Sequence, residues 1–296
     1  MKANNVRIGA LSPSQLLYTY GVGAIVDLPH LSVIVNGLDD WTTNPTYVYE
    51  IQEDRLLHAV KSELVGQVEH LFSMPIVQEA FDQSKPFEKE AHIGVPVSTF
   101  PQWMVCPSCR LLAPIQSELF ELKIDFYHPD RTHYEHVNCK ASRKNPTALP
   151  ARFLVACERR HLDDFPWVEF VHDFDESKYD HTSLTLSEYG PSGEARDLYV
   201  ECITCKARRQ LAEAFGRENR EKMPFCKGRR PHLHDYDPQP CDYHMRAIIL
   251  GASNLWFSYV MNSIAIPTTI DKLAILVNEN WSMLERISTQ DEISTL

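Results

Sequence analysis

The chain has 296 residues, of which 44% are hydrophobic and 23% are charged, and its formal net charge is −11. This length and composition are typical of one large globular domain or two smaller ones, and they exclude a disordered chain. The negative charge excludes a protein that coats nucleic acid with its whole surface, because its average field repels phosphate. No apolar run approaches the roughly 18 residues that span a bilayer, and the first residues lack an apolar signal core. We therefore expect a cytoplasmic protein without a membrane partner.

The first expected region, residues 1–103, mixes helix and strand and contains no cysteine. Near its start, Gly21 and Gly23 stand in the stretch TYGVGAIVDLP, which resembles a phosphate-binding loop. A dinucleotide fingerprint needs a third glycine where Val26 stands, and no Walker lysine follows. The residues after the glycines favour a strand rather than a helix N-terminus. We interpret the glycine pair as a tight turn or a point of close backbone packing.

Further along this region, the pattern predicts a short strand within residues 31–41 and a helix over residues 54–72. Pro75 would end that helix. Residues 91–103 are punctuated by prolines and are expected to be extended. The helix is predicted from apolar residues at spacings of three and four, namely Leu57, Val60, Leu64, Val68 and Leu71.

The second expected region, residues 104–245, is rich in cysteine, histidine, proline and charge. Segments rich in Val, Tyr, Phe and Thr predict strands here, and one segment predicts a short helix over residues 208–218. The predicted strands cover residues 153–157, 168–172, 184–189 and 198–202.

The third expected region, residues 246–296, returns to an apolar pattern that should form helices packed on the core. One helix is predicted in SNLWFSYVMNSIAIP, ending at Pro267, and an amphipathic helix over residues 270–287. The apolar face of the second helix would carry Leu273, Leu276, Val277, Leu284 and Ile287. The whole pattern predicts an α+β fold, with a mixed core and two small zinc-stabilised, ribbon-like β modules in the middle of the chain.

The eight cysteines carry the clearest chemical signal in the sequence. Disulfides are not expected in a cytoplasmic chain, and a C-x2-C turn places two thiolates where both reach one tetrahedral zinc ion. The spacing predicts two closed, structural sites and therefore two zinc ions. The first quartet is Cys106, Cys109, Cys139 and Cys157, and the second is Cys202, Cys205, Cys226 and Cys241.

Several alternatives to this ligand set stay open. His136 stands three residues before Cys139, and His161 stands four residues after Cys157, so either histidine could replace Cys157 as a ligand. Cys157 could also be a buried small hydrophobe, and a C-x2-C pair could be a redox pair. Near Cys241, weaker competitors are His232, His234 and His244.

Basic residues follow three of the cysteines and could form a local phosphate-binding face on an otherwise acidic chain. The alternative is a solvated rim that offsets the negative charge of the zinc thiolates. These candidate nucleic-acid contacts are Arg159, Arg160, Lys206, Arg208, Arg209, Lys227, Arg229 and Arg230.

The sequence gives little support for catalysis. The stretch HLDDFPW could suggest a metal-dependent hydrolase that uses His161, Asp163 and Asp164. No H-E-x-x-H motif, phosphate loop or nucleophile motif accompanies it, so we expect a loop anchored by its aromatic residues. We therefore expect neither an enzyme nor a small-molecule substrate.

Five phrases, in order along the chain, resemble the DrmB family of the bacterial anti-phage system DISARM. They are SQLLYTYGVGAIVDLP, IVNGLDDW, IGVPVSTFPQWMVCPSC, PARFLVACERRHLDDFPWVEFVH and GASNLWFSYVMNSIAIP. The resemblance implies a non-catalytic, scaffold-like subunit that acts on DNA together with DrmA, a superfamily-two helicase-like ATPase. Family members are commonly longer, so this chain corresponds to their N-terminal half. The stretch CERRH departs from the family, which usually has a glycine before this histidine.

Two functions follow as hypotheses. In the first, the chain is a zinc-bearing subunit that helps a helicase-like ATPase to grip or load DNA in an anti-phage complex. In the second, it is a stand-alone zinc-ribbon protein that binds nucleic acid by itself, with an affinity that falls steeply as salt rises. The net charge of −11 disfavours strong binding by the isolated chain.

Overall fold

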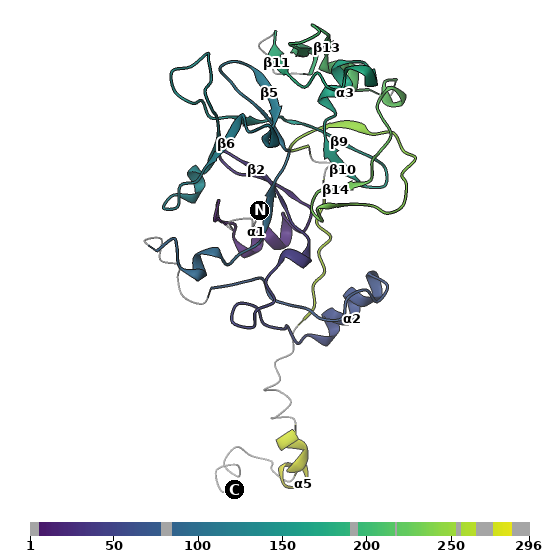
Figure 1. Ribbon diagram of the computed structural model, residues 1–296. Coiled ribbons are helices and arrows are strands. Elements are labelled where there is room, and N and C mark those ends of the chain that lie inside the picture. The colour runs from purple at the N-terminus through teal and green to yellow at the C-terminus, as the bar shows by residue number, and fades with distance from the viewer. Residues whose placement is uncertain are drawn as a thin grey trace. The chain divides into compact units, whose positions relative to one another are not determined.

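The computed structural model describes residues 6–77, 85–189, 195–216, 218–252, 256–264 and 275–285 (Figure 1). The chain divides into two units. Unit 1 comprises Met1–Tyr49 and Ser73–Tyr259, and unit 2 comprises Glu50–Phe72 and Val260–Leu296. Short helices and several small antiparallel sheets make up the described fold, as the α+β prediction expected.

Unit 1 begins with a short helix and a three-stranded antiparallel sheet. Ser12 caps the helix: its hydroxyl accepts from the N–H of Gln15, whose side chain in turn accepts from the N–H of Ser12. The sheet has the order β1-β2-β3, and all four residues of β2 are buried. The elements are α1 (Pro13–Tyr18), β1 (Ile25–Asp27), β2 (Ser32–Val35), η1 (Leu38–Asp40), η2 (Lys89–His92) and β3 (Val97–Thr99).

The glycine pair between α1 and β1 is a structural turn, as predicted. Gly23 has a φ of +82°, a left-handed conformation that an L side chain rarely adopts. Gly21 is needed for a different reason, because a Cβ there would lie 2.8 Å from Cζ2 of Trp256. The indole of Trp256 also donates from Nε1 to the carbonyl of Val22 at 3.2 Å. The turn is therefore closed by a tryptophan, and β1 follows it directly.

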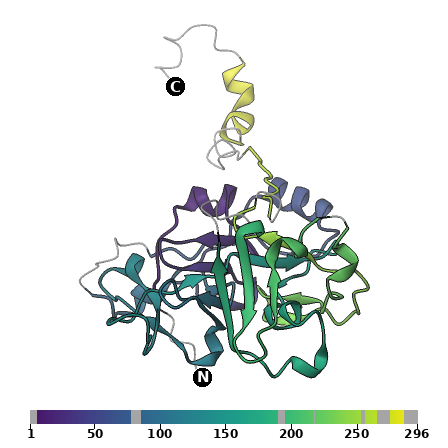
Figure 2. The ribbon, with the colours of Figure 1, turned by 90° about the horizontal axis from the view of Figure 1, so that it is seen from above.

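The middle of the chain forms a six-stranded antiparallel sheet with the order β13-β12-β11-β5-β4-β8. Its teal and green strands lie side by side in Figure 2. The predicted strand over 198–202 is confirmed, and the one over 184–189 ends one residue early. The strands are β4 (Trp103–Val105), β5 (Leu111–Pro114), β8 (Leu149–Pro150), β11 (Leu184–Glu188), β12 (Leu198–Cys202) and β13 (Arg208–Gln210).

Three smaller antiparallel sheets surround this one. The sheet β10-β9-β16 contains the strand predicted over 153–157, and the hairpins β6–β7 and β14–β15 complete the set. The bounds are β6 (Phe120–Lys123), β7 (His133–His136), β9 (Phe153–Ala156), β10 (Leu162–Asp164), β14 (Arg229–Arg230), β15 (Asp235–Tyr236) and β16 (Arg246–Ile249).

Two predictions in this region are wrong. The segment predicted as a strand over 168–172 is the helix α3 (Trp167–Val171), because Trp167, Phe170 and Val171 lie on one buried side at spacings of three and four. The segment predicted as a helix over 208–218 is β13 followed by a 3-10 turn. The 3-10 turns here are η3 (Ile115–Ser117), η4 (Pro129–Arg131), η5 (Glu176–Lys178), η6 (Ala195–Asp197), η7 (Leu211–Ala214) and η8 (Arg220–Lys222).

The core of unit 1 consists of separate apolar clusters. The largest packs α3, β9, β11 and β12 together and includes Cys157, Cys202, Cys226 and Cys241. A second, smaller cluster contains Cys106 and Cys139 together with Met104 and Phe120. A third consists of buried apolar residues around β1 and β2 and has no buried cysteine. The cysteines are thus divided between two different cores.

Unit 2 contains α2 (Asp54–Glu63) and α5 (Trp281–Leu284). The predicted helix over 54–72 begins where expected but ends early, because Val65 and Gly66 have positive φ values of 51° and 77°. The chain then pairs back on itself through a bridge between Glu50 and Phe72.

The C-terminal predictions are met only in part. Residues 256–264, the described part of the helix predicted to end at Pro267, are not helical. Residues 275–279 and 281–284 are helical within the predicted 270–287, and Leu273 and Ile287 lie outside the described residues. No helix in the described ranges has the length and apolar character needed to cross a membrane.

Candidate metal centres

Three groups of four cysteine and histidine side chains converge in unit 1. Within each group, the potential ligand atoms all lie within 4.8 Å of one another. Group 1 is Cys106, Cys109, His136 and Cys139; group 2 is Cys157, His161, Cys226 and Cys241; group 3 is His172, His181, Cys202 and Cys205. Each group could hold a metal ion.

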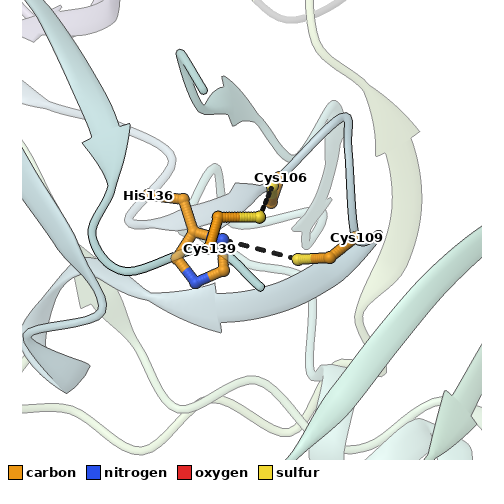
Figure 3. A group of neighbouring side chains, drawn as sticks. All are labelled: Cys106, Cys109, His136 and Cys139. Atoms are coloured by element: carbon orange, nitrogen blue, oxygen red, sulfur yellow. Dashed lines mark hydrogen bonds between the residues drawn. The ribbon is translucent and has the colours of Figure 1, made fainter. Parts of the chain in front are cut away.

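Group 1 joins two hairpins. Cys106 and Cys109 lie in the turn between β4 and β5, while His136 ends β7 and Cys139 follows it (Figure 3). The Sγ atoms of Cys106 and Cys139 are 3.8 Å apart, and Sγ of Cys109 is 3.4 Å from Nδ1 of His136. The three sulfurs and the imidazole therefore face one centre, as tetrahedral coordination of a metal ion requires.

Burial affects the protonation of two ligands in group 1. It raises the pKa of the Cys109 thiol to about 12, so at neutral pH a bound cation would have to displace its proton. Burial also lowers the pKa of His136, which favours the neutral imidazole that ligates metal.

Group 2 brings together residues that are far apart in the sequence. His161 Nδ1 lies 3.4 Å from Sγ of Cys157 and 3.3 Å from Sγ of Cys226, and Sγ of Cys241 is 3.8 Å from that of Cys157. The other ring nitrogen, Nε2, lies 3.0 Å from a carboxylate oxygen of Asp237. Such a carboxylate fixes the tautomer and orientation of a metal-ligating histidine.

Group 3 lies between α3 and the knuckle that follows β12. His172 directly follows α3, His181 precedes β11, and Cys202 ends β12. Its four ligands all fall in sequence between His161 and Cys226 of group 2, so group 3 is nested inside the loop that group 2 closes.

The structure groups the predicted ligands differently from the two expected quartets. All eight cysteines lie in one of the groups, but each group also contains histidine, and the described part of the chain forms three groups rather than two. Cys157 is not near Cys106; it lies with Cys226 and Cys241, while Cys202 and Cys205 form a separate group. The reason is strand pairing: β9, which Cys157 directly follows, pairs with β10 beside His161 and with β16 shortly after Cys241, and not with the strands beside Cys106.

The histidines explain why spacing alone misassigned the quartets. His136 and His161, which the sequence left open as substitutes for Cys157, lie in groups 1 and 2. His172 and His181 were missed, because neither stands near a cysteine in the sequence. The sequence offers only a weak indication of their role: both histidines come before the hairpin β11–β12, which ends at the Cys202–Cys205 knuckle.

Most of the candidate nucleic-acid contacts are engaged within the protein. Five of the eight form ion pairs with carboxylates, and Arg208 lies over the rings of Tyr189 and Tyr199. Arg160 and Lys206 are exposed and make no ion pair with a described residue. The five pairs are Arg159–Asp237, Arg209–Asp173, Lys227–Glu169, Arg229–Asp163 and Arg230–Asp235.

The residues of the alternative hydrolase do not converge on one centre. His161 faces the thiols of group 2, whereas Asp163 and Asp164, on β10, both pair with Arg229. A further oxygen of Asp164 accepts from the backbone N–H of Gln102 at 2.7 Å. This arrangement is that of a partly buried charge cluster whose carboxylates are already paired.

The chain is similar to the DISARM protein DrmB of Bacillus paralicheniformis (strain ATCC 9945a / NCIMB 11709 / CD-2). The two are 29% identical over 217 residues, which cover 68% of this chain and 36% of the relative. The chain thus spans about a third of the length of that relative. A family model described as a domain of unknown function (DUF8724) matches residues 12–257. The match begins at Ser12, which caps α1, and ends one residue after Trp256, the tryptophan that contacts Gly21. Because this match covers most of the chain, the protein belongs to the DUF8724 family.

Proposed function

We propose that this chain is a non-catalytic subunit of a DISARM-like anti-phage defence complex. The observation that carries the proposal is its similarity to the DISARM protein DrmB. The described residues support a structural role, because the Asp-rich stretch that could have served a hydrolase is occupied by Arg229.

Within such a complex, the partner is the helicase-like ATPase DrmA, and the complex acts in the cytoplasm. The sequence contains no Walker-type phosphate-binding motif. In its glycine pair, Gly21 lies against the ring of Trp256 and Gly23 against that of His232. In this proposal the ATPase hydrolyses ATP and this chain acts as a scaffold.

DNA contact belongs to the complex rather than to the isolated chain. The net charge is −11, and most candidate basic side chains are already paired with carboxylates or stacked on tyrosines. Arg160 and Lys206 are the exposed exceptions. Each has a left-handed backbone conformation in a turn that follows a cysteine, with φ values of 68° and 64°.

Groups 1 and 2 hold structural zinc ions in this proposal. Their donor sets fit: each has three thiolates and one imidazole, which suit zinc at a tetrahedral centre, and most of these side chains are buried. Four protein ligands leave no open position for water, so zinc there would cross-link hairpins rather than catalyse a reaction.

The defence proposal is tested by co-expressing the tagged chain with a helicase-like ATPase encoded beside it. We expect the two proteins to co-purify and the ATPase to hydrolyse more ATP with DNA when the chain is present. The Arg160→Ala, Lys206→Ala double variant should reduce DNA binding by the complex and the slope of its salt dependence. An Arg230→Ala variant serves as the control, because Arg230 is paired with Asp235.

The proposal fails if the ATPase purifies alone and phage resistance is unchanged when the chain is deleted. Strong, salt-sensitive DNA binding by the isolated chain would instead support the stand-alone nucleic-acid-binding alternative.

A further inference from the structure

We propose that His172, His181, Cys202 and Cys205 form a third metal centre, which takes a divalent zinc-type cation. The proposal rests on the proposed function only in its premise that this chain ligates zinc. It does not depend on the defence role, and its test separates group 3 from groups 1 and 2.

The first argument is an unpaired nitrogen on His172. This buried side chain donates from Nδ1 to the carbonyl of Val168 at 2.8 Å, one turn back in α3. That bond places the proton on Nδ1 and leaves Nε2 with a lone pair. Nε2 is buried and has no hydrogen-bond partner among the described residues. A buried acceptor without a partner is costly, and a metal ion would satisfy it.

His181 has the complementary arrangement. Its Nδ1 is also buried and without a partner in the described part of the chain, while Nε2 lies 3.7 Å from a carboxylate oxygen of Asp180. The two imidazole rings are 5.8 Å apart at an interplanar angle of 68°. The two histidines with orphaned ring nitrogens thus belong to one group with the thiols of Cys202 and Cys205, and the ring of His172 is held from its other side by Val168.

The second argument is that the cysteine knuckle of group 3 repeats that of group 1, bond for bond. In group 1, Cys106 N donates to Leu111 O and Arg110 N donates to Cys106 O, both at 2.9 Å. In group 3, Cys202 N donates to Ala207 O at 2.9 Å, and Lys206 N donates to Cys202 O at 3.0 Å. The residues after the second cysteines, Arg110 and Lys206, have φ values of 63° and 64°.

This repetition matters because the knuckle is a metal-binding turn rather than a generic one. It aims two thiols at one point and leaves the other two ligand positions to the elements opposite. In group 1 those positions are filled by His136 and Cys139, and in group 3 by His172 and His181. Two thiolates and two imidazoles at a tetrahedral centre are a donor set for zinc.

The test measures zinc per chain in the purified full-length protein by elemental analysis. We expect wild type to carry three ions and the His172→Ala, His181→Ala double variant to lose at least one. His128→Ala is the matched control, because His128 is an exposed histidine outside the three groups; it should keep the wild-type content.

Two further variants keep the proposal falsifiable if the double variant fails to fold. His172→Cys offers a thiolate in place of the imidazole, so it should retain the third ion where His172→Ala does not. Replacement of zinc by cobalt should show thiolate-to-metal absorption that falls in a Cys202→Ser variant. An unchanged zinc content in the double variant would overturn the proposal. An unchanged content in Cys106→Ser and Cys226→Ser would instead overturn zinc binding at groups 1 and 2.

Discussion

The three-stranded sheet β1-β2-β3 and the cysteine-rich middle of the chain are stabilised in different ways. The first buries Val26, Leu31, Val33 and Val35 in a cluster without a buried cysteine. The second contains strands as short as the two-residue β14 and β15, which could not be stable as an isolated hairpin. In the middle region, cysteine and histidine groups lie where such short elements meet. Apolar burial alone accounts for the first region, whereas in the second the largest apolar cluster also contains cysteines of groups 2 and 3, where bound metal would add cross-links between short hairpins.

The largest expected effect is that of removing metal. A chelator in mild denaturant should unfold the middle region, because structural zinc contributes about 10–16 kcal/mol to folding in small zinc-binding peptides. Hydrogen exchange should show amide protection lost first in β11 and β12 and later in β2. Added zinc should restore it. Simultaneous loss of protection in β2 and β12 would show that the two regions are not stabilised separately.

The metal groups themselves should not respond alike. Groups 2 and 3 share one apolar cluster, which includes Cys157, Cys202 and Cys226, while Cys106 of group 1 lies in another. Cys226→Ser should therefore weaken zinc retention in group 3 as well, by the reciprocity of coupled sites. Cys106→Ser should leave that retention nearly unchanged. Timed zinc release to a coloured chelator measures both, and equal effects of the two variants would contradict the coupling.

A smaller but still large effect is expected for Arg229→Met. The variant leaves the partly buried carboxylates of Asp163 and Asp164 without their cation. Breaking a fully buried pair costs about 3–5 kcal/mol, so the loss here should approach the lower end of that range. Arg230→Met is the matched control, since its partner Asp235 is 45% exposed and the pair should contribute about 0–1 kcal/mol. Urea unfolding compares the two variants, and equal losses would show that burial of the cluster contributes nothing.

In the cysteine-free region, Gly21→Ala should destabilise the protein by about 1–3 kcal/mol. The new methyl group would lie 2.8 Å from the Trp256 ring, which must move. Gly94→Ala, where no atom lies within 4 Å of the new Cβ, is the control. Thermal unfolding measures the loss and elemental analysis the zinc content, which should stay at the wild-type value. A fall in zinc content would indicate that the turn supports the metal groups.

The smallest effect is expected for Ser12→Ala, which removes the cap of α1. The Ser12 hydroxyl accepts from the N–H of Gln15 at 3.2 Å, and losing such a cap costs about 0.5–2 kcal/mol. Hydrogen exchange at the Gln15 amide should quicken, while the amides of β12 stay protected. Unchanged exchange at Gln15 would show that the capping bond does not stabilise the helix.

The sequence predicted those elements whose stabilising contacts are local. The strands beginning at Phe153, Leu184 and Leu198 were predicted from runs of β-branched and aromatic residues, and the turn at Gly21 and Gly23 from its missing third glycine. The same composition failed over 168–172, where packing of Trp167 and Phe170 into the large cluster favours a helix. Local propensity was overridden there by tertiary burial.

The candidate site was less predictable, because ligand grouping depends on which strands pair. The spacing predicted that Cys106, Cys109 and Cys139 lie together, but nothing local shows that the fourth member of the group is His136 rather than Cys157. In group 2, Cys157 and His161 are separated from Cys226 and Cys241 by a long stretch of sequence. His172 and His181 carry no motif at all, so only the folded chain brings them to Cys202 and Cys205.

The nesting of group 3 inside the loop of group 2 has a consequence for synthesis. The ribosome makes the chain from its N-terminus, so the ligands of group 1 emerge first and all four of group 3 emerge before Cys226. At translation rates of roughly 5–20 residues per second, Cys241 follows Cys205 by a time on the order of seconds. During that interval Cys157 and His161 are exposed without the other two residues of their group. Capture of metal by the inner group before the outer one would keep these early ligands from pairing with the wrong thiols.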